Sequence, residues 1–170
     1  MVHQHFRLVS NYTIAQNIIL GAEPQKKLLG FIPVVDEAKA NREIAELSKQ
    51  YGLDVDPLKV IEDVNVSTRQ RVEILKMLYR NAEILIFDEP TAVLTPQEIE
   101  SPLDITRALR DGGKTIILIP HQLEEIRKVA DRCAILRRGK LIDIRDVPGM
   151  DAKEMAALMV GHEVQLSTAK

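Results

Sequence analysis

Two adjacent carboxylates, Asp88 and Glu89, follow a run of large apolar residues, ILIF at 84–87. We expect that run to form an interior strand, and in parallel α/β sheets ligands bind beyond the carboxyl ends of the strands. A carboxylate at this position can hold Mg²⁺, directly or through water, while its neighbour polarises an attacking water molecule, as nucleotide hydrolysis requires. The alternative is that the two carboxylates only cap the turn that follows the strand.

The elements that must position these carboxylates alternate between helix and strand. QRVEILKMLYR at 70–80 has helical periodicity and leads into ILIF, a helix near 103–110 passes through DGGK into TIILI, and LEEIRKVAD leads into CAILRRGKLIDI. This alternation predicts an α/β fold with a mostly parallel sheet flanked by helices. The unbroken apolar runs are typical of strands covered on both faces, and RRGK at 137–140 predicts a hairpin turn.

The first third of the chain predicts a small helical subdomain. The segment 36–53 places Ile44, Leu47 and Tyr51 on one helical face, and Gly52 is a suitable end for that helix. Glycines and prolines around the helix are expected to divide the remainder into short segments joined by loops.

Two helix starts are predicted after the acidic pair. TPQE at 95–98 combines a capping threonine with proline at the first helical position. Pro102 is expected to break that helix, and Ser101 to cap a second one. The last helix is predicted over AKEMAALMV and should be closed by Gly161.

Composition narrows the class of protein. The 23 basic and 25 acidic residues give no basic bias, and 4% aromatic residues without Trp argue against a base-stacking surface, so nucleic acid is not an expected partner. The single cysteine, Cys133, is expected to be a buried apolar thiol in a reducing compartment. His3, His5 and His162 share no metal-ligand spacing with an acidic or thiol partner.

Longer strings resemble the ATP-binding subunit of ABC transporters over nearly the whole chain. ILIFDEP resembles the Walker B strand with its catalytic glutamate, PHQLEEI the switch-histidine loop and VHQHF the glutamine loop. QRVEILKMLYRNAEILIFDEPTAVLTPQE is similar to the ATPases of simple-sugar and nucleoside importers. The resemblance implies a partial P-loop NTPase-like domain, with a glutamine-loop remnant at 1–10, the helical subdomain at 11–66 and the C-terminal part of the ATPase core at 67–170.

The resemblance also implies a role for each matched residue. Asp88 becomes the Mg²⁺-associated carboxylate and Glu89 the general base that activates water. His121 becomes the sensor of the γ-phosphate, and Gln4 approaches the metal and the attacking water. ATP and Mg²⁺ are therefore the cofactors expected in the complete domain.

One part of the family pattern does not occur in the chain, because no G-x-x-x-x-G-K-[ST] phosphate cradle is present. GGKT at 112–115 does not replace it, since Ala108 stands at the first glycine position and the segment should lead into a strand instead of a helix. In the family the cradle lies upstream of the glutamine loop, so we expect Met1 to be an internal start. We expect the 170 residues alone to bind ATP negligibly and to expose a sheet edge or face.

The signature segment is also altered, because VNVST at 64–68 stands where the family has LSGGQ. In the family this segment presents backbone amides and a serine hydroxyl to the γ-phosphate held by the opposite subunit. Asn65 and Ser67 remain as polar contacts and Arg69 adds a positive charge, but Val66 and Ser67 replace both glycines. We expect a weakened composite site; the alternative is that the variant loop still works.

The resemblance implies the energy-coupling ATPase of an importer for simple sugars or nucleosides, peripheral on the inner, cytoplasmic face of the cell membrane. Its expected partners are the permease membrane subunits, a second ATPase domain in tandem or as a dimer, and indirectly a solute-binding protein. The alternative is a non-catalytic interaction module that retains only the transporter-docking surface. Without a phosphate cradle, the sequence does not predict that these 170 residues are an enzyme on their own.

Overall fold

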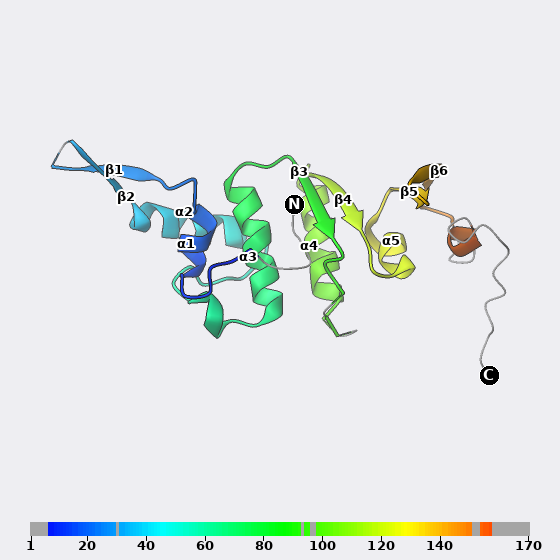
Figure 1. Ribbon diagram of the computed structural model, residues 1–170, viewed down its shortest axis with the longest axis horizontal. Coiled ribbons are helices and arrows are strands. Elements are labelled where there is room, and N and C mark those ends of the chain that lie inside the picture. The colour runs from blue at the N-terminus through cyan, green and yellow to red at the C-terminus, as the bar shows by residue number, and fades with distance from the viewer. Residues whose placement is uncertain (1–6, 30, 93, 96–97, 151–153, 158–170) are drawn as a thin grey trace. The chain divides into compact units, whose positions relative to one another are not determined.

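The computed structural model describes residues 7–29, 31–92, 94–95, 98–150 and 154–157. The chain divides into two compact units, Met1–Ile119 and Pro120–Lys170. The first unit contains α1 (Ile14–Ile19), β1 (Gln25–Leu28), β2 (Ile32–Val35), α2 (Glu37–Gln50), the 3₁₀ helix η1 (Ile61–Asp63), α3 (Val66–Tyr79), β3 (Ile84–Asp88), α4 (Glu100–Asp111) and β4 (Thr115–Ile119) (Figure 1). The second contains α5 (Leu123–Val129), β5 (Arg132–Arg137) and β6 (Lys140–Asp146). None of the helices in these ranges has the length and apolar character needed to cross a membrane.

The predicted order of helix and strand is confirmed around the acidic pair. α3 leads into β3, α4 leads into β4, and the two strands pair in parallel with Asp88 opposite Ile119. In the described residues this is the one parallel pair, because β1 with β2 and β5 with β6 pair antiparallel. The α/β class is therefore confirmed, while the pairing is less parallel than predicted.

A single apolar core joins the helices of the first unit to β3. α3 buries Val72, Leu75 and Leu78 as predicted, and β3 buries Leu85 and Phe87 on one face. The core stabilises the fold mainly by removing this apolar surface from water, at about 25 cal/mol per Å².

The other face of the parallel pair is open among the described residues. Ile84, Ile117 and Ile119 are 58%, 49% and 44% exposed, since successive side chains of a strand point to opposite faces. The expectation of an exposed sheet face is confirmed. Coverage of both strand faces is not seen in the described ranges.

α2 follows its predicted pattern closely. The Asp36 carboxylate caps its start by accepting a hydrogen bond from the Lys39 amide at 3.1 Å. Ile44 is fully buried, and the helix ends before Gly52, whose φ of +63° is a conformation that glycine adopts readily.

The hairpin of β1 and β2 was not predicted, because its glycine and prolines indicated loops. The two strands pair with Lys27 opposite Pro33, and the hairpin projects beyond α1 and α2 (Figure 1). A two-stranded ribbon leaves an unpaired edge on each strand, so a proline without an N–H is tolerated there. Lys26 forms an ion pair with Asp36 at 3.8 Å at the base of the hairpin.

The prediction of two helices after Thr95, the second of them starting at Ser101, needs a correction. Thr95 does bond to the Glu98 carboxylate, through its amide at 2.9 Å and its hydroxyl at 2.7 Å, but α4 begins two residues before Pro102. A fresh start at Ser101 is therefore wrong, because Pro102 sits in the first helical turn, where no N–H partner is needed. Positions 96–97 lie outside the described residues.

The second unit contains the predicted hairpin of β5 and β6. Arg138 and Gly139 have φ values of 49° and 74°, which a two-residue turn of this kind requires. Cys133 is half-buried, less than expected, and packs against a small core that includes Met155. Residues 154–157 are helical as predicted, while Gly161 lies outside the described residues.

Candidate functional site

The acidic pair leaves the carboxyl end of a parallel strand, as predicted. Asp88 is the last residue of β3, and the amide of Glu89 donates a hydrogen bond to the carbonyl of Ile119, at the end of β4, at 2.8 Å. Both acidic side chains are half-buried. The end of the strand pair thus fixes the backbone that carries the two carboxylates.

Glu89 adopts an unusual backbone conformation. Its φ is 46°, in the left-handed region, which costs an ordinary L-residue about 1–2 kcal/mol. The turn closes when the amide of Ala92 donates to the carbonyl of Glu89 at 3.2 Å. Strained backbone of this kind concentrates at functional sites.

The capping alternative finds no support in the described residues. Within them, neither the Asp88 nor the Glu89 carboxylate accepts a hydrogen bond or forms an ion pair. Among the residues that the structure describes, both carboxylates are thus without a hydrogen-bond or ion-pair partner. An unpaired carboxylate at a strand end suits Mg²⁺, which is commonly held by one or two carboxylates together with phosphate oxygens and water.

The described side chains do not form a complete metal site by themselves. In the ranges that the structure describes, no group of three or more His, Cys, Asp or Glu residues could hold a metal ion.

The triphosphate cradle is not supplied by GGKT. Gly112 caps the C-terminal end of α4, Gly113 has a φ of 86°, and the segment continues into β4. A phosphate-binding loop has the opposite order, from strand to helix. The described part of the chain therefore contains no phosphate cradle at GGKT.

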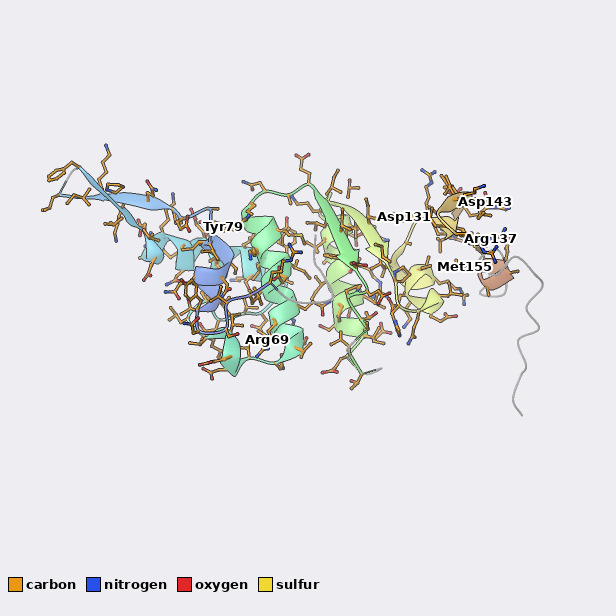
Figure 2. The ribbon with its side chains drawn as sticks, in the orientation of Figure 1. Arg69, Tyr79, Asp131, Arg137, Asp143 and Met155 are labelled. Carbon is orange, nitrogen blue, oxygen red and sulfur yellow. The ribbon has the colours of Figure 1, made fainter. Side chains whose placement is uncertain are left out.

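The altered signature segment forms the start of α3. The Asn65 side-chain oxygen caps this helix by accepting a hydrogen bond from the Thr68 amide at 2.8 Å, and Ser67 is half-buried in the first turn. Arg69 turns back toward the preceding loop, where its guanidinium donates to the carbonyls of Val64 at 3.1 Å and Glu62 at 3.3 Å (Figure 2). The positive charge expected to serve a ligand is thus used to close this loop.

The structure does not test the remaining predicted site residues, His121 and Gln4. His121 is exposed and follows β4 by two residues in the chain, at the start of the second unit. Gln4 lies outside the described residues, as do His3, His5 and His162. The roles of Gln4 and His121 stay predictions.

Two residues near the site were missed. Gln70 and Glu73 lie on α3 and are only 5% and 7% exposed. Gln70 donates to the carbonyl of Pro90 at 2.9 Å, and Glu73 accepts from the amide of Arg7 at 2.9 Å. The sequence did contain a signal for these two residues. Both are polar, and both stand close to Val72, which lies on the buried face of the helix.

Comparisons with known proteins agree with these features. The ABC transporter family matches residues 1–92. Over 170 residues the chain is 52% identical to the nucleoside import ATP-binding protein NupA of Lactococcus lactis subsp. cremoris (strain MG1363), covering 100% of this chain and 33% of that protein. It is 49% identical to the guanosine import ATP-binding protein NupO of Bacillus subtilis (strain 168), covering 100% of this chain and 32% of that protein. The chain thus spans about a third of the length of these curated relatives.

A solved structure supports the fold. The dimeric bacterial ABC transporter cassette MJ0796 aligns with a TM-score of 0.65 at 20% sequence identity, covering 88% of this chain and 62% of the cassette. At this identity the likeness concerns the fold alone.

Proposed function

Because this chain belongs to the ABC transporter family, we propose that it is part of the ATP-hydrolysing subunit that powers an importer for nucleosides or simple sugars. The observation that carries the proposal is the acidic pair at the end of β3, whose carboxylates have no partner among the described residues. The names of the relatives, which are import ATP-binding proteins for nucleosides and guanosine, support the choice of solute class.

The chemistry assigned to the chain is water activation beside a bound cation. MgATP supplies the phosphoryl group and a metal charge that offsets the charge on its oxygens. Asp88 would hold the cation, directly or through water. Glu89 accepts the proton from the water whose oxygen forms the new bond to the γ-phosphorus, as the bond from that phosphorus to the leaving ADP oxygen breaks. In this proposal His121 contacts the γ-phosphate and Gln4 contacts the metal.

The proposed partners follow from the same family role. Permease membrane subunits receive the energy of hydrolysis, which places the protein on the inner face of the cell membrane, and a solute-binding protein delivers the solute. A second ATPase domain faces the start of α3, where Asn65 and Ser67 contact its γ-phosphate. Because Val66 and Ser67 carry side chains where the family has glycines, we expect this composite site to turn over more slowly than one with glycines.

The base assignment is tested by Glu89→Gln in the complete polypeptide assembled with its membrane subunits. The substitution keeps the shape of the side chain but removes the proton acceptor, so we expect kcat to fall by about 10²–10⁴-fold while MgATP still binds. Glu83→Gln is the matched control, because exposed Glu83 precedes β3 and lies at its other end. Unchanged turnover in Glu89→Gln would rule out the assignment.

A non-catalytic docking module, which would retain only the surface that contacts the membrane subunits, is the second candidate. The DNA immediately upstream of the Met1 codon distinguishes the two functions. An in-frame G-x-x-x-x-G-K-[ST] there supports the ATPase, whereas a stop codon close upstream supports the module.

A further inference from the structure

Two buried polar side chains lie on one face of α3 and each binds the backbone of a distant segment. Gln70 and Glu73 are three residues apart, so they lie on the same side of the helix. They are 5% and 7% exposed, which makes their hydrogen bonds costly to lose. Their partners are 20 and 66 positions away in the sequence.

The bond from Gln70 holds the turn that carries Glu89. Its Nε2 donates to the carbonyl of Pro90 at 2.9 Å, one residue after the proposed base. On the other side of Glu89, the amide of Glu89 donates to Ile119 at 2.8 Å. The left-handed backbone at Glu89 is therefore fixed at both ends, by β4 and by α3.

The bond from Glu73 holds a second segment of the chain, about one helical turn further along the same face of α3. Its Oε1 accepts from the amide of Arg7 at 2.9 Å, and the Lys76 ammonium donates to the carbonyl of Arg7 at 3.4 Å. A carboxylate acceptor strengthens the first of these bonds. Arg7 is three residues along the chain from Gln4, the proposed reporter to the membrane subunits.

We propose that Gln70 and Glu73 are positioning residues that make α3 a rigid link between the backbone at Arg7 and the turn that carries Glu89. The inference rests on the proposed function, because it gives the two side chains a role in placing the base. A displacement at Arg7 is transmitted through α3 to the carbonyl of Pro90. Within the helix it passes from Glu73 to Gln70, which are less than one helical turn apart. Glu89 then moves relative to the attacking water, and displacements of about 1 Å can change rates by about 10²-fold.

The test measures kcat and KM for MgATP in the complete polypeptide assembled with its membrane subunits. Gln70→Met keeps the length of the side chain and removes the donor, and Gln70→Glu keeps its shape and places an acceptor against the carbonyl of Pro90. We expect both to lower kcat by about 10–100-fold with KM within twofold. Glu73→Leu should lower kcat similarly, whereas Glu73→Gln keeps an acceptor for the amide of Arg7 and should restore most of the rate.

Two controls separate positioning from loss of structure. Gln50→Met changes an exposed glutamine at the end of α2 and should leave kcat unchanged. In a Glu89→Gln background, Gln70→Met should alter the residual rate less than twofold, because the base through which it acts is already absent. Thermal midpoints identify any variant that fails to fold. If Gln70→Met fails to fold, Gln70→Glu is used in its place.

Each outcome decides one of two claims, the positioning role of Gln70 and Glu73 or the proposed function. If Glu89→Gln abolishes turnover and both Gln70 variants retain kcat within twofold, the positioning role is overturned and the proposed function stands. Equal losses from Gln70→Met with and without Glu89 also overturn it, since they indicate a general structural role. If Glu89→Gln itself retains turnover, the proposed function fails first.

Discussion

Replacing Glu89 should stabilise the protein if its backbone is strained. The left-handed φ of 46° costs an L-residue about 1–2 kcal/mol, a penalty that glycine does not have. Glycine loses about 0.5–1 kcal/mol through the greater freedom of the unfolded chain. The difference predicts that Glu89→Gly raises the free energy of unfolding by about 0.5–1 kcal/mol. The half-buried carboxylate has no partner among the described residues, so its removal costs little.

The assay is urea unfolding followed by far-UV circular dichroism, with thermal midpoints as a second measure. A stabilisation of 1 kcal/mol corresponds to about 2–4 °C for a chain of this size. Glu89→Asn should fall between glycine and the natural residue, because asparagine tolerates the left-handed region. Glu89→Gln keeps the strain and should match the natural protein. If Glu89→Gly is less stable than Glu89→Gln, the strain argument is refuted.

Three further substitutions test the packing of the first unit. Burial, together with a hydrogen bond to Glu43 at 2.9 Å, raises the pKa of Tyr79 to about 12. Because this folded-state pKa lies above the unfolded value of about 10, the contribution of Tyr79 to the free energy of unfolding should be constant below pH 10 and fall between about pH 10 and 12. Tyr79→Phe should remove this fall and cost about 1 kcal/mol at pH 7, measured by urea unfolding across pH; a fall that persists in the variant would contradict the assignment. Leu75→Ala, at a fully buried position of the core, should cost about 3–5 kcal/mol in the same assay, and a loss below 1 kcal/mol would show that this site repacks. Asn17→Ala should cost about 1–3 kcal/mol, because the fully buried amide exchanges hydrogen bonds with the backbone of Val9 at 2.7 and 3.0 Å; hydrogen exchange at the Val9 amide should accelerate, and unchanged exchange would show that another group holds it.

The elements next to the acidic pair were predictable because their patterns are local. β3 is a short apolar run that ends in two charges, and α3 repeats large apolar residues at helical spacing. The turn at Arg138 and Gly139 needs only a glycine between two strand-like runs. In these cases propensity and packing favour the same structure.

The features that sequence did not predict depend on contacts or on strand pairing. The hairpin of β1 and β2 contains Pro33, whose tolerance on a ribbon edge is visible only once the pairing is known. The contact from Gln70 to Pro90 joins residues 20 apart, and no local pattern specifies it. The left-handed backbone at Glu89 runs against the preference of a residue before proline for extended structure. Tertiary contacts therefore override local preference at the turn that carries the proposed base.

The uncovered isoleucines of β3 and β4 have a thermodynamic consequence for any measurement on this chain. Ile84, Ile117 and Ile119 present aliphatic surface to water on one side of the strand pair. Any molecule that covers this surface in the folded state and not in the unfolded state shifts the folding equilibrium by mass action. The apparent melting temperature of the isolated 170 residues should therefore rise with protein concentration as copies associate through this surface.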